Sequence, residues 1–246
     1  MTAKRAPRKR KESVDITNEF SDVYKKTFSC SNIKMKKMLP ITDNQTKFYY
    51  ASQDDKTNMI LLDGPAGSAK SYCAVYSALE MLKEGKVDKI IYIRTVVESA
   101  SKSIGFLKGD EDSKLAPYVL PLIDKALEST DKPTVNSLIE QEYIKAIPVN
   151  FVRGLTFNNS AVIFDEIQNA TKAEITTVLT RFGRNSKFFL LGDSKQKDIR
   201  DSGFEEVYTK FDTDFSRKNN IHCMKFDTSD IVRSQILKHI TAVLGV

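Results

Sequence analysis

The chain has 246 residues, of which 41% are hydrophobic and 28% are charged, and this composition is typical of a globular protein with one core. It contains three cysteines far apart in the sequence and only two histidines, which argues against a disulfide framework and against a metal site built from these residue types. No run of about 18 apolar residues occurs, so we expect no membrane-spanning helix. The first residues carry positive charges without the apolar region of a signal peptide, so we expect a cytoplasmic protein.

The net charge of +6 is concentrated at the N-terminus, where residues 1–11 read MTAKRAPRKRK. These residues hold six basic side chains, and without them the chain has 32 basic and 32 acidic residues. We predict a disordered basic tail over residues 1–20, a segment leading into the domain over residues 21–40, and one domain over residues 41–246. The tail either binds phosphate backbones, with an affinity that falls steeply with salt, or keeps the protein soluble.

Short apolar runs alternate with helical patterns from about residue 40 onward. The runs are rich in β-branched or aromatic residues and are bounded by polar residues, which predicts strands buried on both faces. Residues 70–85 have helical spacing and end at a glycine, so the first two runs enclose a crossover helix, as in the βαβ unit of a parallel sheet. The predicted fold class is therefore α/β, with a mostly parallel sheet in the middle of three layers. The four runs are MILLD (59–63), KIIYIR (89–94), AVIFDE (161–166) and KFFLLGD (187–193).

The stretch GPAGSAKS at residues 64–71, between the first run and the helix, matches most of the phosphate-binding P-loop pattern. That pattern, G-x-x-x-x-G-K-[ST], turns backbone N–H groups toward phosphate oxygens at the start of a helix. We expect Lys70 to reach the β- and γ-phosphates and Ser71 to bind Mg²⁺ through its hydroxyl. The alternative is a glycine-rich turn without a ligand. The predicted nucleotide-binding residues of this loop are Gly64, Pro65, Ala66, Gly67, Ser68, Ala69, Lys70 and Ser71.

Ala69 occupies the position of the second glycine of the P-loop pattern. Its methyl group fits if its backbone angles remain in a region that L-residues favour and if its Cβ points away from the phosphate. We expect Gly64 to serve the tight turn and Gly67 to allow close approach of the backbone to the phosphate. The sequence therefore predicts a loop that binds and hydrolyses a nucleotide rather than a loop kept only as a scaffold.

Two adjacent carboxylates, Asp165 and Glu166, end the run AVIFDE. At a strand tip in the same sheet, Asp165 can hold Mg²⁺ opposite Ser71, and Glu166 can polarise the attacking water as general base. Gln196 follows the fourth run, within LLGDSKQ, and is our candidate sensor of the γ-phosphate; the alternative is a surface glutamine. Together with Lys70, these residues predict a nucleotide and Mg²⁺ as the ligands, and the family resemblance described next implies that the nucleotide is ATP.

These motifs resemble the PhoH family, P-loop ATPases related to the first motor domain of RecD-like helicases. The resemblance covers more than three quarters of the chain, from TDNQTKFYYA (42–51) to the C-terminus, and includes VRGLTFNNSAVIFDEIQNAT (152–171) and SDIVRSQIL (229–237). It implies a RecA-like fold. It also implies that Gln45 reads adenine through its side-chain amide, the alternative being an exposed helical glutamine.

Helicases of this lineage bind ATP between two RecA-like domains, the second of which supplies an arginine to the transition state. This chain has room for one such domain, so we expect a neighbouring copy to supply the arginine, with a hexameric ring as the favoured homo-oligomer. The preferred candidates are Arg181, expected on a helix near the acidic pair, and Arg233, in SDIVRSQIL. Arg153 and Arg184 are further candidates, and the alternative for each is a solvated surface arginine.

Two functional classes follow from the motifs and the resemblance. The first is an ATPase or helicase-like motor that depends on RNA or single-stranded DNA, contacted by the basic tail, residues 46–52 (TKFYYAS) and residues 99–110. The second is an ATP-switched assembly protein that acts on a protein partner. The form of the family with this domain alone is often viral, in which case we expect the host cytoplasm as its location.

Overall fold

The computed structural model describes residues 28–38, 42–95, 111–232 and 235–244. Over these residues the protein is built on one six-stranded sheet, whose strands all pair in parallel in the order β3-β2-β4-β5-β1-β6. The expectation of a mostly parallel sheet is confirmed. The strands are β1 (Met59–Asp63), β2 (Lys89–Arg94), β3 (Ile144–Pro148), β4 (Ser160–Asp165), β5 (Lys187–Gly192) and β6 (Ile221–Lys225).

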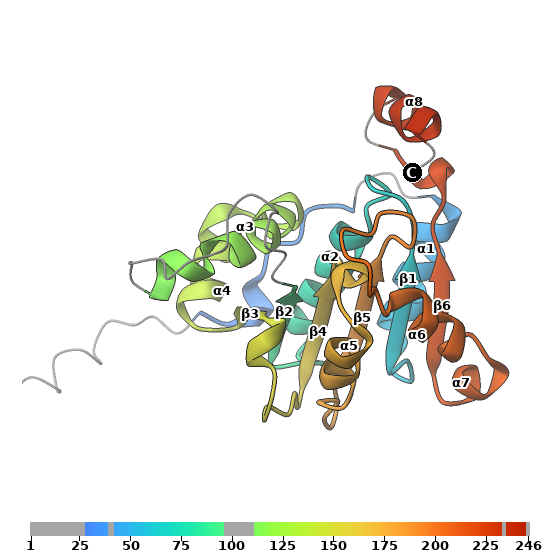
Figure 1. Ribbon diagram of the computed structural model, residues 1–246. Coiled ribbons are helices and arrows are strands. Elements are labelled where there is room, and N and C mark those ends of the chain that lie inside the picture. Colours follow the sequence, from blue (N-terminus) through green and yellow to red (C-terminus); the bar gives the residue numbers. More distant parts are fainter. Residues whose placement is uncertain (1–27, 39–41, 96–110, 233–234, 245–246) are drawn as a thin grey trace, which may run out of the picture.

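Helices cover both faces of the sheet, which confirms the three-layer architecture (Figure 1). One face carries α1 (Asp43–Gln53), α2 (Lys70–Lys83), α3 (Glu111–Ser129) and α4 (Lys132–Glu140), and the other carries α5 (Lys172–Leu179) and α6 (Phe204–Phe211). The short α7 (Asp214–Lys218) contacts the edge strand β6, and α8 (Gln235–Leu244) stands clear of the sheet. Within the described ranges, no helix combines the length and the apolar character needed to cross a membrane.

Side chains alternate along each strand and build a separate core on each face of the sheet. On β4, Ala161 and Ile163 belong to the core under α2, whereas Val162 and Phe164 belong to the core under α5. Because both faces are covered, the central strands read as continuous apolar runs rather than as alternating ones. The strand position of a side chain therefore decides which helical layer it meets.

The sequence located the four central strands to within one residue and missed the two edge strands. β3 reads IKAIP and β6 reads IHCMK, so a lysine or a histidine interrupts each apolar pattern. Such residues are tolerated because an edge strand is less covered than a central one. The expected crossover helix is α2, and Gly85 follows it with a φ of 72°, as expected for a helix stop.

The described part of the segment leading into the domain, residues 28–38, packs against the α2 face. Ile33 is 1% exposed, and the hydroxyls of Thr130 and Tyr76 donate to the carbonyls of Lys34 (2.8 Å) and Lys36 (3.1 Å). This segment therefore belongs to the same core as residues 42–95. The predicted basic tail, residues 1–20, lies outside the described residues.

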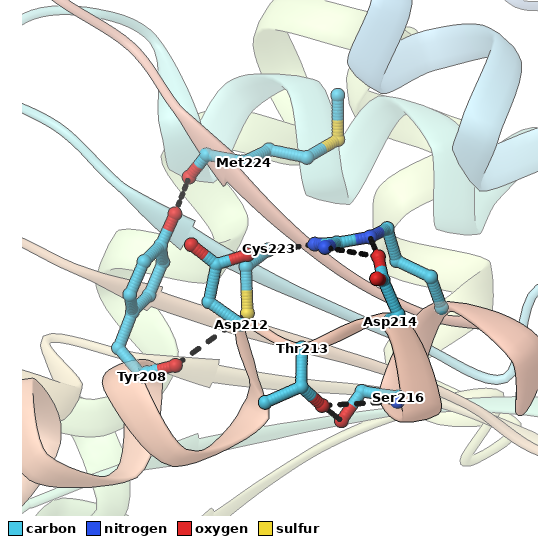
Figure 2. A network of polar contacts seen from close by, with 8 residues as sticks. Tyr208, Asp212, Thr213, Asp214, Ser216, Cys223 and Met224 are labelled. Atoms are coloured by element: carbon cyan, nitrogen blue, oxygen red, sulfur yellow. Dashed lines mark hydrogen bonds and ion pairs between the residues drawn. The ribbon is translucent and has the colours of Figure 1, made fainter.

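Polar contacts join α6 to the edge strand β6 and cap the neighbouring α7 (Figure 2). The Tyr208 hydroxyl donates to the Met224 carbonyl (3.1 Å), and the Cys223 thiol lies 3.7 Å from the Tyr208 carbonyl oxygen. Thr213 caps α7 by accepting a hydrogen bond from the Ser216 N–H (3.2 Å). The Tyr208 contacts thus fix α6 to β6, and β6 itself pairs in parallel with β1, the strand that leads into the P-loop.

Lys187, at the start of β5, is a buried cation that joins two elements. It is 5% exposed, and its ammonium donates to the carbonyls of Ser52 (2.6 Å) and Asp54 (2.7 Å) at the C-terminal end of α1. A helix C-terminus favours a cation, but burial and the nearby charge of Lys86 lower the pKa of Lys187 from 10.5 to about 8. Keeping Lys187 charged in the folded protein therefore costs free energy.

We predict that Lys187 makes the free energy of unfolding rise with pH above about pH 8. Between about 8 and 10.5 the unfolded chain binds more protons at this residue than the folded chain, so raising the pH favours the folded state by at most about 3 kcal/mol. Urea unfolding of wild type and Lys187→Met should show a stability difference that grows in favour of wild type over this range.

The comparison with Lys187→Met is needed because buried thiols act in the opposite direction. Burial raises the pKa values of Cys73 and Cys223 to about 12, so these groups destabilise the fold as pH rises through their unfolded values. A difference between wild type and variant that does not change with pH would contradict the assignment to Lys187.

Candidate functional site

The P-loop, the acidic pair and Gln196 lie at the edge of the sheet where β1, β4 and β5 have their carboxyl ends. β5 lies between β1 and β4 in the sheet. The loop after β5 therefore begins between the end of β1 and the end of β4. The carboxylate of Asp63, at the end of β1, accepts hydrogen bonds from the N–H and the hydroxyl of Ser194, both at 2.9 Å. This contact joins the P-loop strand to the loop that carries Gln196.

The structure corrects the role expected for Gly64, whereas close approach of a phosphate to Gly67 stays a prediction. Gly67 has a φ of 80° and therefore serves the turn. Gly64 serves close packing, because a Cβ there would lie 2.8 Å from the Cβ of Phe226 and 3.0 Å from its carbonyl oxygen. The loop is closed by Ser68, whose N–H and hydroxyl donate to the Pro65 carbonyl at 3.3 and 2.7 Å.

Ala69 does not adopt the backbone angles that an L-residue favours, contrary to our expectation. It has φ 67° and ψ 22°, in the left-handed region, where an L-residue costs roughly 1–2 kcal/mol relative to the right-handed region. The position is one that a glycine would occupy without strain. Ala69 is also the N-cap of α2 and provides no side-chain cap, so the first N–H groups of this helix stay available for an anion.

Lys70 folds back onto its own loop. Its ammonium donates to the carbonyls of Gly64 (2.5 Å) and Pro65 (3.0 Å). Burial lowers the pKa of Lys70, and the carboxylates of Asp193 and Asp165 act in the opposite direction. A phosphate would offer this cation a stronger partner than two neutral carbonyls.

Asp165 is the centre of the polar contacts at the end of β4. It is 5% exposed, and its Oδ1 accepts hydrogen bonds from the Ser71 hydroxyl (3.0 Å) and the Glu166 N–H (3.1 Å). Its Oδ2 accepts a 2.5 Å hydrogen bond from the hydroxyl of Tyr92, on β2. Ser71 and Asp165 are therefore adjacent, as predicted for the two ligands of one ion.

Glu166 follows the strand and turns the chain with a φ of 55°, a conformation that is uncommon for this residue type and concentrates at functional sites. Its carboxylate accepts a 2.6 Å hydrogen bond from the Gln168 amide and lies 3.8 Å from the Arg94 guanidinium. Burial and the Asp165 charge raise the pKa of Glu166, while Gln168 and Arg94 act in the opposite direction. The group has the partial burial and basicity that suit a general base.

Gln168 and Asp193 belong to the site and were not found from the sequence. The Gln168 amide nitrogen bonds Glu166, and its oxygen accepts from the Asp193 N–H (3.1 Å), so it links the acidic pair to the loop after β5. Asp193 is 5% exposed, and its Oδ2 is buried without a partner among the described residues. Both follow strand ends, which is the signal that could have identified them.

Gln196 lies in the loop after β5 and is half-buried. Its N–H donates to the Asp193 carbonyl (3.2 Å), which closes a turn. The loop thus lies beside the P-loop strand, where a γ-phosphate sensor is expected, and the sensor role of Gln196 stays a prediction.

Gln45 is buried, so the alternative of an exposed helical glutamine is wrong. Its amide nitrogen donates to the carbonyls of Ser68 (3.1 Å) and Asp230 (2.9 Å), and its oxygen caps α1 by accepting from the Thr42 N–H (3.1 Å). Asp230 in turn accepts from the side chains of Thr42 and Asn44. Adenine recognition by Gln45 stays a prediction and requires these bonds to be exchanged.

The structure corrects the placement of Arg181. It follows the end of α5, its guanidinium donates to the Leu155 carbonyl (3.4 Å), and its own carbonyl accepts from the Phe157 N–H (3.0 Å). Residues 155–157 lead into the amino end of β4, so Arg181 is at the opposite edge of the sheet from the acidic pair. Arg233 lies outside the described residues. Among the described residues, Arg94 lies beside the acidic pair, although its sequence pattern indicated only a strand residue.

The oxygen ligands suit magnesium bound together with a nucleotide. Mg²⁺ is usually held by one or two protein oxygens and by substrate phosphates rather than by an all-protein cage. Ser71 and Asp165 supply two such oxygens, and the described residues contain no group of three or more His, Cys, Asp or Glu side chains that could hold an ion. The residues present therefore fit a Mg–nucleotide complex.

Comparison with known proteins identifies the family. A family model described as PhoH-like protein matches residues 37–245. The chain belongs to the PhoH family. It is 32% identical to a PhoH-like protein of Bacillus subtilis over 221 residues, which are 90% of this chain and 68% of that protein. It is 31% identical to the protein PhoH of Escherichia coli over 198 residues, which are 78% of this chain and 54% of that protein.

Solved structures agree with the fold of this PhoH-family chain. The large terminase of a thermophilic bacteriophage superimposes on 82% of the chain with a TM-score of 0.53 at 11% identity, and the match covers 49% of that protein. The same terminase in complex with ADP gives a TM-score of 0.51 at 10% identity. At such identities the likeness concerns the fold alone, a RecA-like P-loop architecture.

The strained backbone of Ala69 gives a testable prediction for this PhoH-family chain. Ala69→Gly relieves the left-handed strain but increases the entropy of the unfolded chain, so we expect the free energy of unfolding to stay unchanged or to rise by up to about 1 kcal/mol. The matched control is Ala74→Gly in the buried interior of α2, which should destabilise by about 1 kcal/mol or more. Urea denaturation measures both, and equal destabilisation of the two variants would contradict the assignment of strain.

Proposed function

We propose that this PhoH-family protein binds Mg–ATP and hydrolyses it. The observation that carries the proposal is the adjacency of Ser71 and Asp165, 3.0 Å apart and contributed by different elements, at the edge of the sheet where the P-loop helix begins. The structural neighbour solved with ADP supports nucleotide binding by this fold. The match of residues 37–245 to the PhoH-like family model supports a P-loop ATPase.

Each residue has a defined task in the proposed reaction. The N–H groups at the start of α2 and the ammonium of Lys70 bind the phosphates, and Lys70 exchanges its two carbonyl contacts for them. Ser71 and Asp165 would hold Mg²⁺, which would supply positive charge opposite the phosphate oxygens. Glu166, oriented by Gln168, accepts the proton of the attacking water.

We further propose that RNA or single-stranded DNA stimulates hydrolysis and that the protein acts as a homo-oligomeric ring, with a hexamer favoured and an arginine supplied by a neighbouring copy. The proposed nucleic-acid surface includes the basic tail and the exposed side chains of residues 46–52. Within that stretch Tyr50 is 68% exposed and suited to stacking on a base, whereas Phe48 is fully buried and is excluded as a contact.

The second candidate function is an ATP-switched assembly protein that acts on a protein partner. The observation that favours it is the apolar face of α8, on which Ile236, Ile240, Val243 and Leu244 are all exposed. Exposed apolar side chains at this spacing are typical of helices that contact another protein.

We predict that Glu166→Gln keeps its affinity for Mg–ATP but hydrolyses it at least about 100-fold more slowly, because only the proton acceptor is lost. Lys70→Ala should lose the binding itself. The matched control is Glu84→Gln, which removes an exposed carboxylate at the far end of α2. Calorimetry and phosphate release measure the two steps, and equal turnover in wild type and Glu166→Gln would refute the proposed active site.

We predict that deletion of residues 1–11 weakens RNA binding and reduces the slope of log affinity against log salt concentration, because up to six basic side chains are removed. ATP turnover without nucleic acid should stay unchanged. Filter binding over a range of salt concentrations measures the slope. An unchanged slope would assign the tail to solubility. ATP turnover that neither RNA nor single-stranded DNA stimulates would favour the assembly protein.

A further inference from the structure

The hydroxyl of Tyr92 is a buried polar group that none of the proposed steps uses. Tyr92 lies on β2, is 1% exposed and belongs to the apolar core under α2. A tyrosine hydroxyl in such a core requires a hydrogen-bond partner. Its partner is Oδ2 of Asp165, at 2.5 Å.

The register of the sheet brings these two side chains together. Tyr92 pairs with Ile163 across β2 and β4, and Asp165 is two residues further along β4 on the same face. Diagonal neighbours of this kind are within reach of an aromatic side chain. Because the core encloses the Tyr92 ring, its hydroxyl has a fixed position and holds the Asp165 carboxylate there.

The two oxygens of Asp165 therefore have different surroundings. Oδ1 accepts hydrogen bonds from the Ser71 hydroxyl and the Glu166 N–H, whereas among the described residues Oδ2 accepts one from Tyr92. A carboxylate with one oxygen held in this way cannot rotate freely about its last bond. Oδ1 is thereby the oxygen turned toward Ser71 and the start of α2.

We propose that Tyr92 is a positioning residue for magnesium binding: it holds Oδ2 of Asp165, so that Oδ1, beside the Ser71 hydroxyl, would be the oxygen available to the ion. The inference rests on the proposed function, because it assigns Asp165 to Mg²⁺. Groups that hold a metal ligand through its second atom typically change metal affinity or activity by about 10–100-fold when they are removed. Tyr92→Phe removes such a group and retains the aromatic ring in the core.

The experiment measures the affinity for the non-hydrolysable analogue AMP-PNP by calorimetry, with MgCl₂ and with EDTA. In wild type, Mg²⁺ should raise the affinity. In Tyr92→Phe this gain should fall about tenfold or more, while the affinity in EDTA stays within about twofold of wild type. The matched control is Tyr76→Phe, a buried tyrosine whose hydroxyl donates to the Lys36 carbonyl away from the site; it should keep both affinities.

A double-mutant cycle separates positioning from support of the fold. In an Asp165→Asn background, Tyr92→Phe should cause no further loss of the Mg²⁺-dependent gain, because the group that it orients is already changed. Equal losses in MgCl₂ and in EDTA would overturn the positioning role in favour of a structural one. If Mg²⁺ raised the AMP-PNP affinity of Tyr92→Phe as much as that of wild type, the positioning role would be overturned and the proposed function would stand. If the wild-type affinity did not depend on Mg²⁺, both would be overturned.

Discussion

The hydrogen bond from Ser71 to Asp165 joins the first turn of α2, which follows β1, to the end of β4, which is two strands away from β1 in the sheet. Every other part of the site is arranged around this contact. Lys70 precedes Ser71 in the helix, and Glu166 follows Asp165 in the chain. The contact exists because parallel strands bring all their carboxyl ends to one edge, where the crossover helix also begins.

Local strain and burial accompany this arrangement. Ala69 and Glu166, one on each side of the Ser71–Asp165 contact, both have positive φ angles, and such conformations persist only where the surrounding structure imposes them. Asp165 and Asp193 are buried carboxylates, and one oxygen of Asp193 lacks a partner among the described residues. The two sheet cores supply the stability that makes these unfavourable features possible.

The fold could be predicted from the sequence because its central strands are apolar runs with turns at both ends. The P-loop, the acidic pair and their adjacency followed from the same pattern. The pattern could not indicate backbone angles or close packing, so the left-handed Ala69 and the packing of Gly64 against Phe226 were missed. It also could not indicate which buried polar residues contact each other across strands, and Tyr92 and Gln168 were missed for that reason. Arg181 was misplaced because sequence proximity to a motif does not specify an edge of the sheet.

The alternation of side chains along β4 has a consequence for how the protein tolerates insertions and deletions. Ala161, Ile163 and Asp165 point to one face of the sheet, so a shift of β4 by one residue would move all three to the other face. The same shift would turn each apolar side chain of β4 toward the opposite core and would separate Asp165 from Ser71. Selection for a well-packed core and selection for the contact between Asp165 and Ser71 therefore act on a single register. A length change within β4 that harms the core also breaks this contact.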